Sequence, residues 1–225
     1  MPHAGLYIHI PFCRRKCHYC DFYSLPDTDL IPGFRDVLKQ EITLTASDSP
    51  FAGLTFSTVY LGGGTPSLLS PKQIDAILNH VKNSFSILPE AEISMEVNPG
   101  TTTIQRLEGY LLTGVNRLTI GVQSFNNREL KSLSRIHNAD QAEKTIRSAR
   151  KVGFANIGID LIFAIPGQTI ASWQHNVRKA CELAPDHVSI YGLTYEKGTP
   201  LTVELEKGRV NNCAEETERE LLLCG

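Results

Sequence analysis

The sequence of 225 residues lacks any apolar run near the roughly 20 residues that a membrane-spanning helix needs, so we expect no transmembrane segment. It also lacks an excess of either charge. Its 22 Lys and Arg residues against 24 Asp and Glu residues give a net charge of -2, which predicts no nucleic-acid partner. Disordered or low-complexity tracts are missing too, and 41% hydrophobic residues are enough to form one large core. No secretory signal precedes the first apolar segment, so we expect a cytoplasmic protein.

Cysteine is scarce as well, but half of the six cysteines lie within eight residues. Cys13, Cys17 and Cys20 follow the apolar run of residues 6–12 in the spacing C-x3-C-x2-C. The other three are scattered through the second half of the chain without matching spacing. A disulfide framework is therefore not expected, and a reducing compartment fits best.

Three thiolates at the end of a predicted strand can hold a metal cluster. An iron–sulfur cubane has four irons, so three protein thiolates leave one iron open to a small chelating molecule. A zinc site that uses the same cysteines and His18 is an alternative. However, structural zinc sites usually draw their ligands from two separated pairs, and His18 adjoins Cys17.

Short β-branched segments alternate with helical patterns along the chain. The predicted strands are residues 6–11, 57–61, 92–97, 117–123, 156–165 and 187–193. Apolar residues at helical spacing predict helices near residues 70–85, 142–152 and 173–181, and we expect Cys181 in the core. Ser70 and Gln73 form a capping box at the start of the first helix. Strand and helix alternating through six units indicate a parallel sheet closed partly or wholly into a barrel.

Polar residues interrupt these strands at their carboxyl ends, where the loops of such a barrel build the functional site. Residues 62–66 form a triglycine turn that would let a ligand approach the backbone. Glu96 and Asp160 each lie within an apolar strand, and a carboxylate facing the interior needs a cation or a hydrogen-bond donor. Gln123 ends the fourth strand, and Arg135 is a candidate to balance Asp160 or to bind a ligand carboxylate.

The segment from Tyr7 to Pro200 resembles the oxygen-independent coproporphyrinogen III oxidase-like branch of the radical S-adenosylmethionine (SAM) proteins. It carries YIHIPFCxxxCxYCDF, GGGTPS, EVNP, GVQSF, RIH and DLIFAIPGQT in the expected order. The resemblance implies an α/β fold, an open (β/α)6 partial TIM barrel, in a core domain of residues 1–200 followed by a further region at 201–225. It also implies a [4Fe–4S] cluster with SAM on its fourth iron, and release of a 5'-deoxyadenosyl radical on reduction.

The resemblance also assigns roles to individual residues. It places Tyr7, Gly63 and Glu96 at the cluster-bound SAM. A second group matches positions that line a second SAM site in the oxidase: Tyr19, Gly64, Thr65, Gln123, Arg135 and Asp160.

Two functions within this branch stay open. One is a haem chaperone, which binds haem and delivers it to respiratory proteins that require it; the other is the oxidase of porphyrin biosynthesis, which decarboxylates propionate groups. Phe22 stands where the oxidase carries a further cysteine, and the oxidase's N-terminal extension is missing, so the chaperone is favoured. Chaperones of this branch continue into a domain with an H-N-x-x-Y-W haem motif, which this sequence lacks. We therefore expect a piece of a longer protein, and no haem binding by the similar segment 137–142.

Overall fold

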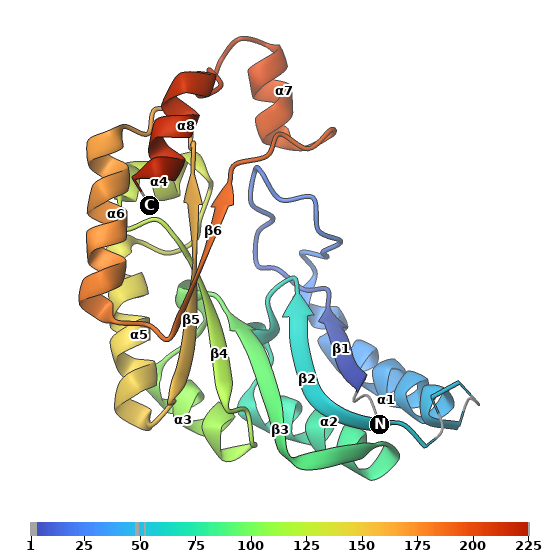
Figure 1. Ribbon diagram of the computed structural model, residues 1–225. Helices are drawn as coiled ribbons and strands as arrows, with labels where there is room; N and C mark the ends of the chain where they lie inside the picture. Colours follow the sequence, from blue (N-terminus) through green and yellow to red (C-terminus); the bar gives the residue numbers. More distant parts are fainter. Residues whose placement is uncertain (1–3, 48–49, 52, 225) are drawn as a thin grey trace.

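Six parallel strands form a single sheet in chain order (Figure 1). The computed structural model describes residues 4–47, 50–51 and 53–224. The strands are β1 (Ala4–Ile10), β2 (Thr55–Gly63), β3 (Ser86–Val97), β4 (Arg117–Gln123), β5 (Asn156–Phe163) and β6 (His187–Gly192). Each predicted strand is confirmed, although β3 begins earlier, at Ser86. The predicted fold, an open (β/α)6 barrel, is confirmed by this order, because in the described residues β1 and β6 are not paired with each other.

Helices follow the strands. Most of them cover one side of the sheet, but the helix of residues 200–206 lies beyond the carboxyl ends of the strands (Figure 1). The helices are α1 (Ile31–Ser47), α2 (Pro71–Ser84), α3 (Ile104–Leu112), α4 (Asn127–Ser132), α5 (Ala139–Val152), α6 (Ile170–Leu183), α7 (Pro200–Glu206) and α8 (Glu215–Leu223). The capping box of α2 forms as predicted, because Ser70 Oγ accepts from the Gln73 N–H while the Gln73 side chain accepts from the Ser70 N–H. No helix of the described residues is long and apolar enough to cross a membrane.

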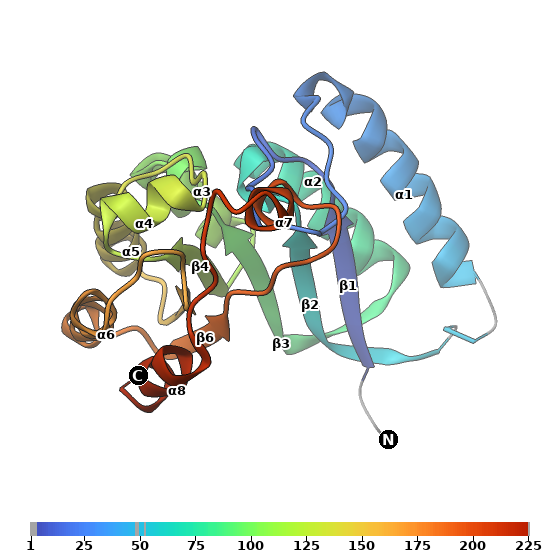
Figure 2. The ribbon, with the colours of Figure 1, turned by 90° about the horizontal axis from the view of Figure 1, so that it is seen from above.

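The two faces of the sheet differ in chemistry. Alternate strand residues such as Ile10, Leu61 and Ile120 are fully buried against the helices and form the main core. The residues between them include Tyr60 and Glu96, and they face the concave side of the arc that Figure 2 shows from above. A closed barrel packs apolar layers into its interior. Here the core lies between sheet and helices, so the concave face is free to carry polar groups.

Cys181 is not in the core as predicted, because it is exposed on α6. The buried residues of that helix include Trp173 and Ala180, and Cys181 lies about 100° further round the helix, which turns it toward solvent. On α8, Leu221 is fully buried against α6 and β5, whereas the two leucines that follow it are exposed. The boundary at residue 200 stays a prediction.

Candidate functional site

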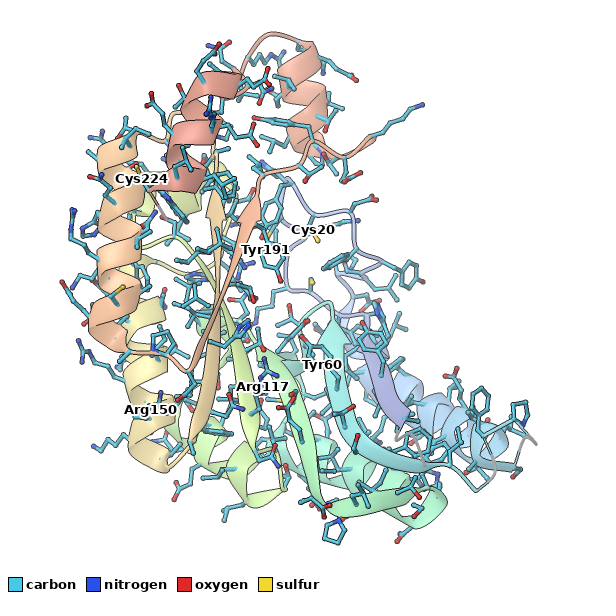
Figure 3. All side chains as sticks on the ribbon, viewed as in Figure 1. Cys20, Tyr60, Arg117, Arg150, Tyr191 and Cys224 are labelled. Atoms are coloured by element: carbon cyan, nitrogen blue, oxygen red, sulfur yellow. The ribbon has the colours of Figure 1, made fainter. Side chains whose placement is uncertain are left out.

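The three clustered cysteines lie in one loop at the carboxyl end of β1, and their thiols line one cavity. Backbone hydrogen bonds hold this loop at its first cysteine and again at His18, between Cys17 and Cys20. The Cys13 N–H donates to the Leu25 carbonyl at 3.0 Å, and the His18 carbonyl accepts from the Leu201 N–H at 2.9 Å. Figure 3 shows Cys20 in this loop, beyond the ends of the strands.

The cavity also gathers nearly all of the residues predicted from strand ends. Its walls include Cys13, Cys17, Tyr19, Cys20, Gly63, Gly64, Thr65, Glu96, Gln123, Arg135 and Asp160. Tyr7 is the exception among the predicted residues. Its ring stacks on Tyr60 with centroids 6.0 Å apart, and its hydroxyl lies 2.9 Å from His9 Nδ1. Because 56% of Tyr7 is exposed, it lies at the edge of the concave face. The roles assigned to these residues stay predictions.

The triglycine turn lines the cavity and also packs closely against the rest of the chain. The approach of a ligand to its backbone stays a prediction. A Cβ on Gly64 would lie 2.7 Å from the Phe12 carbonyl oxygen, and one on Gly63, whose φ is +106°, would lie 2.5 Å from His9 Nδ1. The glycines therefore let the end of β2 pack against the cysteine loop. Next to them, Thr65 Oγ1 lies 3.4 Å from Cys13 Sγ.

Glu96 accepts two hydrogen bonds within the protein, so a ligand is not its only source of donors. The Tyr60 hydroxyl donates to Oε1 at 2.8 Å, and the Gly63 N–H donates to Oε2 at 3.1 Å. Burial raises the pKa of Glu96 to about 6, and these two donors limit the rise. Sequence reasoning missed Tyr60. Its position in β2 could have indicated a contact with Glu96, because it lies on the same face as Gly62 and near Glu96 in register.

Asp160 on β5 is the second carboxylate in the cavity. Burial raises its pKa to about 6, while a hydrogen bond from Ser189 and the positive charge of Arg135 oppose the rise. The charge of Asp160 in turn contributes to the raised pKa of Glu96. Two partly buried carboxylates that resist ionisation in one cavity suit a cationic ligand group, which would favour their charged forms.

Arg135 joins the cysteine loop to the fourth strand. Its Nη1 donates to Cys17 Sγ at 3.5 Å, and its Nη2 donates to the Gly121 carbonyl at 2.8 Å. In the opposite direction, Arg15 Nη2 donates to the carbonyls of Ser134 and Arg135 at 2.7 and 3.1 Å. Sequence reasoning placed Arg135 near the ligand but missed Arg15, whose partners are backbone groups far along the chain.

His137 has both ring nitrogens engaged inside the protein. Nδ1 lies 3.3 Å from Asn98 Oδ1, and Nε2 lies 3.1 Å from the Val122 carbonyl. Burial, together with the charge of Arg135, lowers the pKa of His137 to about 3, so the ring is neutral near pH 7. These contacts explain the histidine of the RIH segment by hydrogen bonding within the protein, without a role in haem binding.

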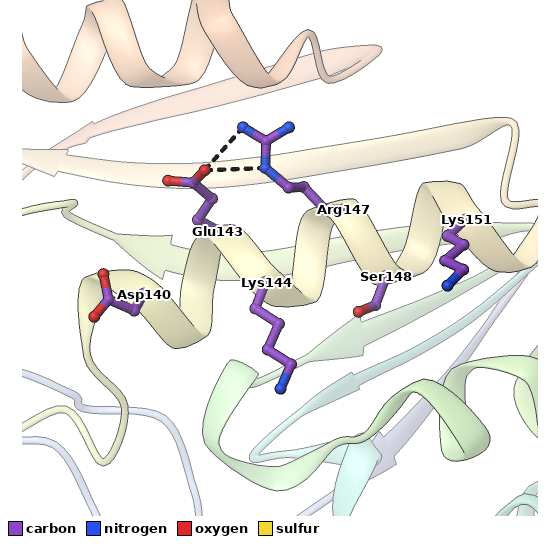
Figure 4. Close-up of a pocket in the computed structure, with 6 residues that line it drawn as sticks. All are labelled: Asp140, Glu143, Lys144, Arg147, Ser148 and Lys151. Atoms are coloured by element: carbon purple, nitrogen blue, oxygen red, sulfur yellow. Dashed lines mark hydrogen bonds and ion pairs between the residues drawn. The ribbon is translucent and has the colours of Figure 1, made fainter.

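A separate hollow runs along the exposed face of α5 (Figure 4). Its charged side chains come from that helix alone, and Glu143 accepts from Arg147 at 2.8 Å, as neighbouring turns of a surface helix commonly do. A hollow with one helix as its wall is open to solvent. We therefore assign it no function.

The donors around the cysteine cavity fit a metal cluster. Within the described ranges, no three His, Cys, Asp or Glu side chains are grouped closely enough for a single metal ion. A [4Fe–4S] cluster needs a wider arrangement of ligands, because each thiolate binds its own iron. Three thiols around one cavity provide such an arrangement. His18, the fourth ligand of the zinc alternative, is exposed and lines a neighbouring hollow.

Comparison with known proteins gives three results. The family profile of the radical SAM superfamily matches residues 7–180. The protein of Danio rerio described as radical S-adenosyl methionine domain-containing protein 1, mitochondrial, is 36% identical over 209 residues, which are 92% of this chain and 47% of that protein. The heme chaperone HemW of Escherichia coli (strain K12) is 39% identical over 200 residues, which are 88% of this chain and 53% of that protein.

Among solved structures, the coproporphyrinogen III oxidase (HemN) of Escherichia coli superimposes with a TM-score of 0.85 and 29% identity. The match covers 97% of this chain and 50% of the oxidase. The chain thus spans about half the length of the curated relatives that it matches.

Proposed function

Because the chain belongs to the radical SAM superfamily, we propose that Cys13, Cys17 and Cys20 bind a [4Fe–4S] cluster whose fourth iron takes SAM. The arrangement that carries this proposal is the convergence of three thiols, glycine backbone and two carboxylates on one cavity. When bound, the cluster supplies the electron that cleaves SAM to a carbon radical.

The residues of the chain position SAM. Glu96 accepts hydrogen bonds from the ammonium group of its methionine moiety, which offsets the cost of holding this carboxylate in the cavity. Gly63 brings the backbone to the same place, and Tyr7 borders it from the edge of β1. The remaining cavity residues, among them Tyr19 and Asp160, line the space in which a second SAM or a substrate lies.

The whole protein, in this proposal, acts as a cytoplasmic haem chaperone. This chain contributes its radical SAM domain. It binds haem, or a related tetrapyrrole, and passes it to a haem-requiring protein. Support comes from the relative at 39% identity described as a heme chaperone.

A second candidate is oxidative decarboxylation of coproporphyrinogen III, supported by the superposition on the Escherichia coli oxidase. Phe22 argues against it, because its exposed side chain stands where the oxidase is expected to carry a further cysteine. Anaerobic incubation with SAM, reductant and coproporphyrinogen III separates the two candidates. Loss of propionate carboxyl groups supports the oxidase, and haem binding by the full-length protein without turnover supports the chaperone.

The cluster is tested by anaerobic reconstitution with iron and sulfide. Alanine at any one of Cys13, Cys17 or Cys20 should abolish the visible thiolate-to-iron absorption. Cys181→Ala is the matched control, because Cys181 is an exposed thiol on α6. An equal loss of absorption in Cys181→Ala would contradict the assignment.

A further inference from the structure

A hydrogen bond joins Arg135 directly to one of the proposed cluster ligands. Its Nη1 donates to Cys17 Sγ at 3.5 Å. We propose that Arg135 is a redox-tuning residue, a role that rests on the proposed function. It raises the reduction potential of the cluster by donating a hydrogen bond to Cys17 and by placing a positive charge beside it. This role is separate from any contact of Arg135 with SAM.

The protein holds the guanidinium in this place from several directions. Nη2 donates to the Gly121 carbonyl at 2.8 Å, and a Cβ on Gly121 would lie 3.3 Å from Nη2, so the strand leaves room for it. Arg15 holds the backbone around Arg135 in turn, because its side chain donates to the carbonyls of residues 134 and 135. Arg15 belongs to the cysteine loop itself. Two arginines therefore tie the same two loops together in opposite directions.

The positive charge on Arg135 is not neutralised by a close carboxylate. Among the described residues no Asp or Glu lies within the 4.0 Å of an ion pair with it. Asp160 feels its charge from a longer distance. His137, which packs nearby, adds no charge of its own near pH 7. The field of Arg135 at Cys17 is thus that of a nearly uncompensated cation in a partly buried site, where screening by water is weak.

The electrochemical consequence follows from charge balance. One electron passes from a low-potential one-electron donor to the cluster, which gains one negative charge, and no bond forms or breaks. A neighbouring cation and an N–H···S hydrogen bond both stabilise the more negative, reduced form. The cluster therefore accepts its electron from a weaker reductant than it would without Arg135.

The test is a spectroelectrochemical titration of the reconstituted chain under anaerobic conditions and without SAM, so that SAM binding does not enter. The midpoint potential of Arg135→Gln should be more negative than that of the wild type. Arg135→Lys, which keeps the charge but not the geometry of the fork, should fall between them. Arg128→Gln is the matched control, because it removes an exposed arginine from α4, and its midpoint should equal the wild-type value.

Resonance Raman spectra give a readout that a loss of folding would not mimic. The Fe–S(Cys) stretching band should move to higher frequency in Arg135→Gln, since a thiolate that accepts no hydrogen bond binds iron more strongly. An Arg135→Gln chain with normal cluster content and an unchanged midpoint would overturn the assignment. If that variant holds no cluster, Arg135→Lys decides in the same way. A wild-type chain that assembles no cluster would overturn the proposed function as well.

Discussion

Asp160 and Glu96 show how single residues of the cavity act against the stability of the fold. Both carboxyls have a pKa of about 6, well above their ordinary values, mainly because burial disfavours their charged forms. The folded chain therefore holds a proton that the unfolded chain has already lost between about pH 4 and pH 6. Stability falls as the pH rises through this window, and the deficit persists above it.

We therefore expect Asp160→Asn to stabilise the cluster-free chain near neutral and alkaline pH. The gain in the free energy of unfolding should be on the order of 2 kcal/mol at about pH 8 and should vanish near pH 4. Urea unfolding at several pH values measures it. Glu108→Gln, at an exposed position of α3, should change stability by less than about 0.5 kcal/mol. A loss of stability in Asp160→Asn at about pH 8 would show that its carboxylate is satisfied in the fold.

At the same scale, Glu96→Gln should weaken SAM binding while leaving the cluster content unchanged. A charge-assisted hydrogen bond is worth about 1.5 to 3 kcal/mol, so the affinity should fall roughly 10- to 100-fold. Anaerobic isothermal titration of the reconstituted chain measures the change. Glu92→Gln is a suitable control, because Glu92 lies on the same strand but pairs with Arg117 at 3.0 Å, away from the cavity. An unchanged affinity in Glu96→Gln would remove Glu96 from the SAM site.

At the scale of elements, sequence pattern predicted those units whose signal is local. The six strands follow from β-branched runs, and α2, α5 and α6 follow from stripes at helical spacing. In contrast α1 was missed, although Ile31, Phe34, Leu38 and Ile42 lie at i, i+3, i+7 and i+11 and form the face that packs on the core. The cavity was predicted because parallel strands end at one edge of a sheet. Arg15 was not, because its carbonyl partners are set by tertiary packing.

One buried cluster of side chains fixes how the loops after β4 and β5 lie against each other. Glu129 Oε2, on α4, accepts from Ser124 Oγ at 2.6 Å, Gln168 Nε2 at 3.1 Å and Asn176 Nδ2 at 2.9 Å. Asn176 Oδ1 also accepts from the Phe125 N–H at 2.8 Å. These bonds join α4, α6 and the two loops that follow β4 and β5. A single carboxylate oxygen thus organises four chain segments.

Glu129→Ala should lower the free energy of unfolding by about 2 to 4 kcal/mol, because it leaves three buried donors without an acceptor. Urea unfolding of the cluster-free chain measures this loss. Glu143→Ala is the control (Figure 4): it removes a surface carboxylate of α5 that pairs with Arg147, and its cost should stay below about 1 kcal/mol. Equal losses in the two variants would mean that the Glu129 cluster contributes no more than a surface ion pair.

At the scale of the whole molecule, we expect the 225-residue chain to bind no haem tightly. Stable capture needs an axial ligand free to reach the iron in an apolar pocket. The rings of His9 and His137 have both nitrogens engaged, and His80 Nε2 is shared between Thr43 and the Lys39 carbonyl. Titration with haem should show no one-to-one Soret shift. A stoichiometric shift that His137→Ala abolishes would make that residue the ligand.

The arginine ties between distant loops also bear on the order in which the protein is made. The cysteines leave the ribosome early, yet the groups that hold their loop are synthesised much later, since Arg15 and Ser134 are 119 residues apart. At translation rates of roughly 5 to 20 residues per second, this interval is on the order of ten seconds. Throughout it the three thiols are carried on a nascent chain without their supporting partners. Iron and sulfide delivered during that time would meet an unformed site. We therefore expect cluster insertion only after the segment that follows β4 has been translated, and the three thiols must stay reduced until then.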